Sequence, residues 1–397
     1  METIKQIYKV GTGPSSSHTM GPRRAALIFK AKNSQATSYK VELYGSLALT
    51  GKGHLTDVVI KNVLGINTDV IFKPEMYYSY HPNGMKLFAY ENDKLIDEWL
   101  VFSVGGGDLK ELNEERSSFG IDCYKEKNMK EILDYATKNN ISLYDYIIEN
   151  DEKDIKEFGN EIIDIMFQSV ERGISATDIL PGNLHLNRKA KDFYQEYLNN
   201  PSLSTLAFSA ALAVSEENAS GGIIVTAPTC GASGVVPGVL YSYHKYFNID
   251  KELLVKGLLV GGLIGNIVKT NGSISGAEVG CQGEVGVACA MAAAALTYIK
   301  GGTNKQIEYA AEIALEHHLG LTCDPLEGYV QIPCIERNAM SCKRAIDSSE
   351  FALLTDGNHH IKFDDAIQTM LETGRDLNKA YRETSIGGLA KIKEHKI

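Results

Sequence analysis

The chain has 397 residues, of which 44% are hydrophobic and 23% are charged. This length exceeds the usual size of one hydrophobic core, so we expect two domains. The formal net charge is −10 and the calculated pI is about 5.6. Lys and Arg form no clusters, which argues against a nucleic-acid partner and favours a small-molecule ligand.

The N-terminal residues, METIKQIYKVGTG, contain no apolar run of signal-peptide length, so we expect a cytoplasmic protein. The strongest apolar run covers residues 253–268 and is interrupted by a lysine, an asparagine and several glycines. It falls short of the roughly 20 apolar residues that cross a bilayer. We therefore predict a buried helix and no membrane partner.

The first third of the chain mixes short strand and helix patterns. Residues 22–32 and 55–64 predict helices, and strands are predicted at residues 39–47, 69–72, 86–90 and 98–104. A polar segment at residues 108–127 is the predicted linker. Together these patterns indicate an α+β domain over residues 1–125, with an antiparallel or mixed sheet.

From about residue 128 the pattern becomes helical. The predicted helices cover residues 129–138, 142–150, 154–172, 189–198, 203–217, 235–245, 251–269, 285–299 and 305–318. We therefore expect an all-α domain over residues 126–397. Four Gly-rich polar segments, at residues 11–22, 219–234, 270–286 and 322–338, interrupt or precede these elements. Such loops let the backbone approach a ligand and are where binding groups are usually mounted.

The cysteine pattern suggests a metal site. Seven cysteines without a secretion signal argue against a disulfide framework. Cys281, Cys323 and Cys334 lie in the Gly-rich segments, where their thiolates can converge. Three thiolates on a four-iron cluster leave one iron open, which is what a Lewis acid acting on a hydroxyl group requires. Isolated cysteines are also often small buried hydrophobes, and this reading suits Cys289 and Cys342.

Seven ordered motifs together resemble the single-chain, iron–sulfur-dependent L-serine dehydratases. They are GTGPSSSHTMGP, LYGSLALTGKGHLTD, HPNGM, SVGGG, ASGGIIVTAPT, SISGAEVGCQGEVGVAC and CDPLEGYVQIPCIERNAM, and the match runs from about Ile4 to Leu389. The resemblance implies an N-terminal domain similar to the allosteric substrate-binding domain of phosphoglycerate dehydrogenases. It also implies a helical domain that carries a [4Fe–4S] cluster, L-serine as the substrate, and a homodimer.

The resemblance assigns roles to individual residues by motif matching. Cys281, Cys323 and Cys334 would be the cluster ligands, and His18 would be the catalytic proton-transfer residue, since a neutral imidazole has suitable basicity near pH 7. Weaker candidates for site contacts are His54, His81 and Cys230. The position of Cys230 is Asn in many relatives, which leaves its role open.

Hydroxyl and backbone N–H donors are expected to bind the substrate carboxylate. The SSSHT segment would bring Ser15, Ser16, Ser17 and Thr19 over the cluster, just before a helix start. Helix capping is the alternative for Ser15, Ser17 and Thr19. We favour binding, because three consecutive serines exceed what capping needs. Asn271 and Ser273, upstream of Cys281, are further candidate contacts.

One departure from the family pattern concerns the C-terminus. Family members often carry a cysteine there that can occupy the open iron, yet this chain ends GGLAKIKEHKI, so we expect no tail thiolate and regard His395 as solvated. Three other functions stay open at this stage. These are a dehydratase for another small β-hydroxy amino acid such as L-threonine, a non-catalytic serine sensor, and a pyridoxal-phosphate lyase, for which we find no convincing lysine motif.

Overall fold

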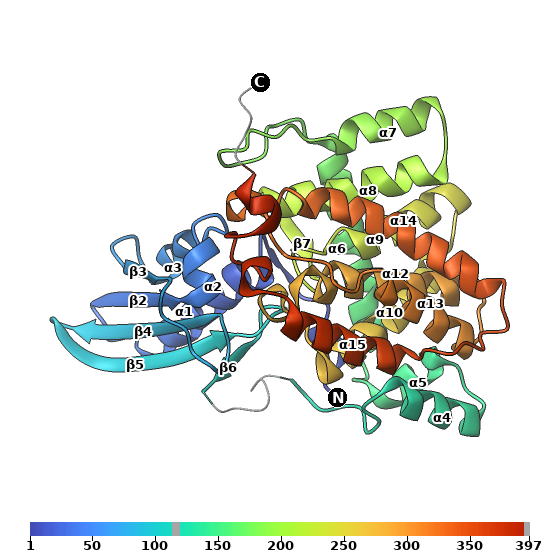
Figure 1. Cartoon of the computed structure of the whole chain (residues 1–397), viewed down its shortest axis with the longest axis horizontal. Helices are drawn as coiled ribbons and strands as arrows, with labels where there is room; N and C mark the ends of the chain where they lie inside the picture. Colours follow the sequence, from blue (N-terminus) through green and yellow to red (C-terminus); the bar gives the residue numbers. More distant parts are fainter. Residues whose placement is uncertain (113–119, 393–397) are drawn as a thin grey trace.

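The computed structural model describes residues 1–112 and 120–392. A region built around a β-sheet lies beside a larger helical region (Figure 1). The mixed architecture that the sequence predicts, with the sheet first and the helices after it, is thus found. The expectation about His395 falls on residues 393–397, outside the described part of the chain.

A mixed five-stranded sheet forms the first region. Its strand order is β3 (Asp69–Lys73), β2 (Ser38–Tyr44), β4 (Gly84–Glu91), β5 (Lys94–Ser103) and β6 (Leu109–Glu111). β2 and β3 are parallel, and the other pairs are antiparallel. Helices α1 (Gly21–Lys32) and α3 (Thr56–Leu64) pack together, and α1 also contacts β4 and β5. Alternate strand residues such as Val41 and Leu43 face this core with Phe29.

Two sequence predictions for this region need correction. The strand predicted at residues 39–47 ends at Tyr44, because Gly45 adopts φ +52° and starts helix α2 (Gly45–Thr50). A Cβ atom at Gly45 would lie 2.4 Å from the Pro82 carbonyl oxygen, so this turn needs glycine. Strand β6 lies inside the segment predicted as a linker.

Helices α10 (Lys251–Asn271) and α12 (Val285–Ile299) pack closely along each other in the second region. A Cβ atom at Gly261 would lie 2.7 Å from the Met291 carbonyl oxygen, so glycine allows this approach. Around them lie α4 (Met129–Asn139), α5 (Leu143–Asn150), α6 (Ile155–Ser175), α7 (Ala190–Asn199), α8 (Leu203–Ala219), α9 (Val235–Phe247), α13 (Asn304–Glu316), α14 (Cys334–Leu353) and α15 (Phe363–Asp376). Helices α14 and α15 were not predicted from the sequence.

Helix α10 is long and apolar enough to span a membrane, and the bent pair Gly276–Gly283 and Val285–Ile299 meets the same criteria. The relevant window of α10 is 78% buried within the protein. This burial agrees with the sequence prediction of a core helix.

The N-terminal segment joins the two regions. Ile4, Ile7 and Tyr8 belong to the core of the helical region, although they precede the sheet in sequence. Strand β1 (Val10–Thr12) then pairs antiparallel with β7 (Ile223–Val225). The domain division at residue 125 stays a prediction, but the first twelve residues pack with the second region.

A buried ionic cluster fastens this junction. The Asp108 carboxylate, 1% exposed, contacts the Lys9 ammonium and lies 2.6 Å from Lys269 Nζ. Burial lowers the pKa of Lys9 to about 8, an effect that the charge of Asp108 partly offsets. Asp108 lies between β5 and β6 of the sheet, Lys9 precedes the sheet, and Lys269 lies on α10, so the cluster ties three distant segments together.

Replacing Asp108 with alanine should destabilise the protein by about 3–5 kcal/mol, because Lys9 and Lys269 would remain buried without their shared counter-charge. Urea unfolding of the purified protein measures this change. Asp134→Ala is the matched control, since Asp134 pairs with Lys130 in an exposed i,i+4 contact and its loss should leave the midpoint nearly unchanged. Equal midpoints for the two variants would contradict this role of Asp108.

Candidate active site

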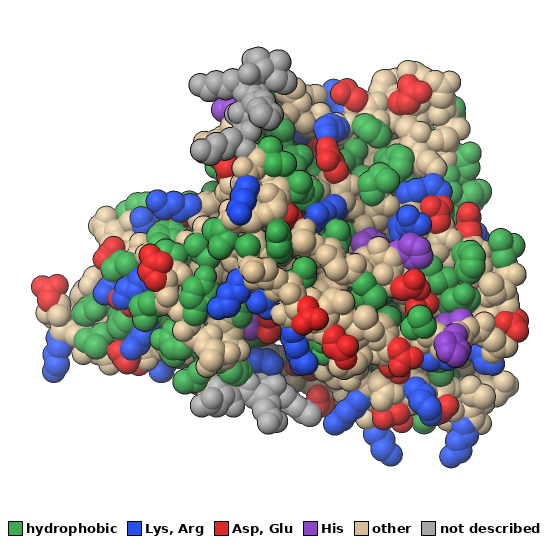
Figure 2. All heavy atoms as spheres, in the orientation of Figure 1, with side chains coloured by type: hydrophobic (Ala, Val, Ile, Leu, Met, Phe, Trp, Pro, Cys, Tyr) green, Lys and Arg blue, Asp and Glu red, His purple; other side chains and the backbone are tan. Residues whose placement is uncertain are grey.

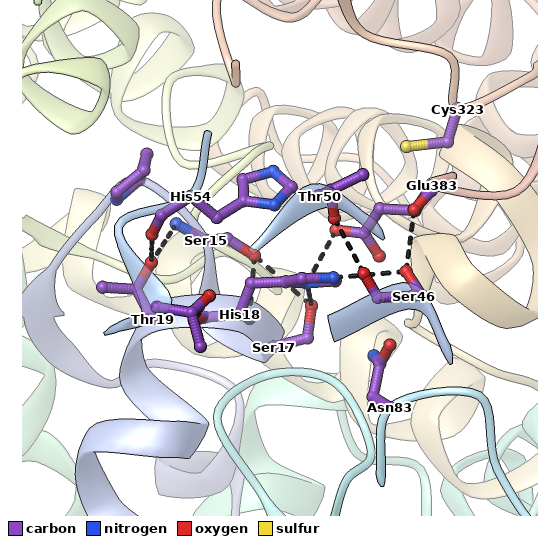
Figure 3. Close-up of polar contacts among 12 residues, drawn as sticks. Ser15, Ser17, His18, Thr19, Ser46, Thr50, His54, Asn83, Cys323 and Glu383 are labelled. Carbon is purple, nitrogen blue, oxygen red and sulfur yellow. Dashed lines mark hydrogen bonds and ion pairs between the residues drawn. The ribbon is translucent and has the colours of Figure 1, made fainter. Parts of the chain in front are cut away.

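The SSSHT segment forms a tight helical turn, Ser16–Met20, that leads into α1 (Figure 3). Ser15 Oγ accepts a hydrogen bond from the His18 backbone N–H at 3.1 Å, and the Ser15 N–H donates to Thr19 Oγ1 at 3.2 Å. Thr19 Oγ1 donates to the His54 carbonyl oxygen at 2.8 Å. Ser15 thus caps this turn and Thr19 holds the next loop. Substrate contacts by Ser15, Ser16, Ser17 and Thr19 stay predictions.

The His18 ring is fully buried and has three polar neighbours. Nδ1 lies 3.0 Å from Ser17 Oγ and 3.2 Å from Glu383 Oε1, and Nε2 lies 3.2 Å from Ser46 Oγ. Ser46 Oγ donates its one proton to the Glu383 carbonyl oxygen at 2.7 Å. Nε2 must therefore carry a hydrogen and donate to Ser46. The basic nitrogen of the neutral ring is then Nδ1, beside the carboxylate.

Glu383 and His54 complete this cluster. Burial alone would raise the pKa of Glu383, but the charge and hydrogen bond of His18 outweigh burial and lower it. The His54 ring centroid is 4.5 Å from that of His18. Burial, together with the charge of His18, lowers the pKa of His54 to about 3, so His54 is neutral near pH 7.

Two buried atoms of the cluster lack partners within the described residues: His54 Nδ1 and Glu383 Oε2. One ligand atom from each of His18, His54 and Glu383 can be chosen so that all three lie within 4.8 Å of one another. Buried polar atoms without partners are costly, which marks this place as one that receives a polar ligand.

In the folded chain, the three predicted cluster ligands are near enough that the charges of Cys281 and Cys334 act on Cys323. Cys281 lies in the turn Gly280–Gly283, Cys323 lies in a loop, and Cys334 is the first residue of α14. The loop prediction thus holds for Cys323, whereas Cys281 lies in a short helical turn and Cys334 lies at a helix start. Burial raises the pKa of Cys323, and the charges of Glu284, Glu383, Cys281 and Cys334 raise it further.

A carboxyl group and a guanidinium adjoin these thiols. Glu284 Oε2 lies 3.9 Å from Cys323 Sγ, and burial raises the pKa of Glu284 to about 8. Burial also raises the pKa of Cys281, to about 11, although the Arg337 charge acts in the opposite direction. Arg337 donates to the Thr322 carbonyl oxygen at 2.5 Å, which fixes its position.

This set of thiols is compatible with a metal cofactor. Three thiols adjoin one guanidinium, which also lies 3.8 Å from an Asp324 oxygen. Two carboxyl groups, Glu284 and Glu383, act on Cys323, so ionising all these groups together requires further positive charge in the site. An iron–sulfur core supplies such charge, and thiolates are its usual ligands. Cys334 is partly exposed while Cys281 and Cys323 are buried, so the group is approachable from one side.

The C-terminal segment connects the thiols to the histidines. The Cys323 N–H donates to the Tyr381 carbonyl oxygen at 2.8 Å, and the Glu383 N–H donates to the Cys323 carbonyl oxygen at 2.7 Å. Glu383 therefore lies between Cys323 and His18 (Figure 3). Sequence reasoning missed Glu383, Glu284, Arg337 and Ser46. The last three lie within the quoted motifs, which was the one available signal, whereas Glu383 lies in no motif.

Three further candidates have side chains engaged outside this cluster. The Asn271 amide donates to the Lys127 and Ile267 carbonyl oxygens, at 2.6 and 3.0 Å, and thus finishes α10. The Ser273 hydroxyl donates to Glu278, and His81 Nε2 lies 3.5 Å from a Glu278 oxygen. Roles for Asn271, Ser273 and His81 in binding substrate stay predictions.

The remaining cysteines have ordinary packing contacts. Cys230 is buried with its Sγ 3.3 Å from Met20 Sδ, next to the SSSHT turn. Cys289 donates to the Ser341 carbonyl oxygen, and Cys342 lies within α14. Their helical positions agree with the reading of Cys289 and Cys342 as core residues, and the role of Cys230 stays open.

Comparison with known proteins places the whole chain in one family. Residues 95–390 match the model of the serine dehydratase alpha chain, and residues 3–68 match that of the beta chain. The chain is 39% identical to L-serine dehydratase of Haemophilus influenzae, over 98% of this chain and 99% of that protein. It is 38% identical to L-serine dehydratase 1 of Escherichia coli, with the same coverage, and to L-serine dehydratase of Streptomyces coelicolor, over 98% of each chain. The chain therefore belongs to the serine dehydratase family and carries the beta-type and alpha-type sequences in one polypeptide.

Proposed function

We propose that this chain is an L-serine dehydratase that eliminates water from L-serine with the aid of a [4Fe–4S] cluster held by Cys281, Cys323 and Cys334. The elimination leaves an enamine, which then takes up water and yields pyruvate and ammonia. The observation that carries the proposal is the backbone pairing of Glu383 with Cys323, because it joins the thiol group to the buried His18 ring.

The elimination removes a proton from Cα and hydroxide from Cβ. A cluster with three protein thiolates supplies Lewis-acid chemistry for the departing hydroxyl group when it is bound. His18 supplies the proton-transfer group: Nδ1, which takes up the proton, lies 3.2 Å from Glu383 Oε1, and this carboxylate stabilises the resulting charge. Ser46 fixes the ring through Nε2, so Nδ1 keeps its orientation.

His54 serves the substrate in this proposal as a neutral polar contact. Its low pKa keeps the ring uncharged, and its Nδ1, like Glu383 Oε2, is buried without a hydrogen-bond partner among the described residues. His54 Nδ1 and Glu383 Oε2 suit two groups of serine: the ammonium group, which donates hydrogen bonds, and the hydroxyl group, which donates and accepts them.

The oligomeric state, the location and the partners of the enzyme also stay proposals. We expect a homodimer that acts in the cytoplasm, with L-serine as its small-molecule partner and with neither a nucleic-acid nor a membrane partner. The net charge of −10 argues against a nucleic-acid partner, and the buried position of α10 argues against a membrane partner.

Alanine at Cys281, Cys323 or Cys334 should each abolish iron retention and activity after anaerobic reconstitution, because each removes one of three ligands. Iron and acid-labile sulfide content, with turnover of L-serine to pyruvate, measure this. Cys289→Ala and Cys342→Ala are matched controls that remove a buried thiol from a helix and should keep both iron and activity. Full iron content in Cys323→Ala would remove that residue from the ligand set.

His18→Ala should retain iron but lose turnover by about 10²–10⁴-fold, the usual contribution of a positioned acid–base group. Glu383→Gln should lower kcat with iron retained, because the amide stabilises a charged His18 ring less well than the carboxylate does. Steady-state kinetics alongside iron content separate the two effects. A His18→Ala enzyme with parental kcat would reduce His18 to a packing residue, and loss of iron would show that it supports the cluster domain.

A further inference from the structure

A cleft of about 640 Å³ opens where the sheet region meets the helical region. The 77–82 loop and Ser46 line it on one side, and residues from the 272–279 and 371–384 segments line it on the other. Ligand-binding pockets typically measure about 300–1,000 Å³, so this cleft is larger than a small amino acid needs.

Three cations line this cleft without a carboxylate partner in the described part of the chain. Arg375 lies in the last turn of α15, and Lys379 Nζ lies 5.0 Å from the centroid of the Tyr77 ring. Arg382 donates to the Glu278 carbonyl oxygen at 3.3 Å, and its Nε is buried without a partner. Figure 2 shows Lys and Arg side chains on the surface where the two regions meet.

Glu278 does not neutralise this group. It is the one carboxylate among the described residues that line the cleft. Its two oxygens face Ser273 and His81. Three cations without a carboxylate partner among the described residues, against one lining carboxylate, therefore give this concave space a net positive charge that favours a small anion.

The cleft ends at the proposed catalytic group. Ser46 lines the cleft and also holds His18 Nε2 at 3.2 Å. Arg382 and Thr384 line the cleft on either side of Glu383 in sequence. His18 and Glu383 are not among the lining residues, so the cleft adjoins this pair through Ser46, Arg382 and Thr384.

We propose that this cleft is an anion-binding antechamber in which Arg375, Lys379 and Arg382 bind the carboxylate of the incoming amino acid. Because the cleft exceeds the size of serine and carries three positive charges, small dicarboxylates also bind there and block entry. Arginine suits this task, since its planar guanidinium binds a carboxylate through two parallel hydrogen bonds. The inference rests on the proposed function, since it assigns the substrate to this opening.

The test uses the reconstituted holoenzyme with malonate as the probe. Malonate should inhibit competitively with L-serine. Arg375→Gln and Lys379→Gln should each raise the KM for L-serine and the inhibition constant for malonate by about tenfold, the expected effect of one charged hydrogen bond of about 1.5 kcal/mol. Their kcat and iron content should stay within about twofold of the parent values. The control Lys94→Gln removes the same charge from an exposed position in the β4–β5 hairpin and should change neither constant.

Parental KM and malonate inhibition in both cleft variants would overturn the inference while leaving the proposed function intact. Failure of the parent protein to hold iron or to turn over L-serine would instead reject the proposed function. Calorimetric titration of malonate into the same preparations distinguishes failure of the inference from failure of the proposed function. Equal malonate affinities for the parent and Arg375→Gln by that measurement would overturn the anion site, whatever the catalytic result.

Discussion

The backbone pairing between Cys323 and the segment 381–383 is the contact on which the candidate site depends. It satisfies both the N–H and the carbonyl group of Cys323 and fixes the C-terminal segment over the thiols. Glu383 adopts φ +54°, which is uncommon for a residue with a side chain. The Ser46 hydroxyl donates a hydrogen bond to the Glu383 carbonyl oxygen and helps to hold this conformation. Such strain occurs where the surrounding structure fixes a group for a function.

Buried charge sets the second constraint. Cys281, Cys323 and Cys334 share their surroundings with two carboxyl groups and the Arg337 guanidinium. Burial raises the pKa of the thiols and of Glu284 and so favours their protonated forms, whereas the charge of His18 lowers the pKa of Glu383. Displacing those protons requires positive charge in the site. In the proposed function, cluster binding is therefore coupled to proton release, and Glu284 is placed to respond to that coupling.

The periodic elements were predictable because their signal is local. The apolar spacing of helices such as α6 and α10, and the strand patterns of β3 to β5, lie within single windows of sequence. Helix α14 also has such a pattern, in Ile335, Ala339, Cys342 and Ile346, but the Gly- and Pro-rich residues before it obscured its start. The partners of His18 could not be predicted, since Ser46 and Glu383 are 337 residues apart and meet only in the folded chain.

The sequence suggests that the glycines of the Gly-rich motifs let the backbone approach a ligand. In the folded protein, several of them instead allow close packing between segments. A Cβ atom at Gly13 would lie 2.0 Å from Asn218 Oδ1, and one at Gly21 would lie 2.1 Å from Ser103 Oγ. These glycines let the SSSHT turn pack closely against α8 and β5, and the Asn218 amide donates to the Pro14 carbonyl oxygen at 2.8 Å. The turn is thus clamped between the two regions on both sides. A site whose histidine comes from one region and whose thiols come from the other needs such a clamp, because a small displacement of either region would separate the reacting groups.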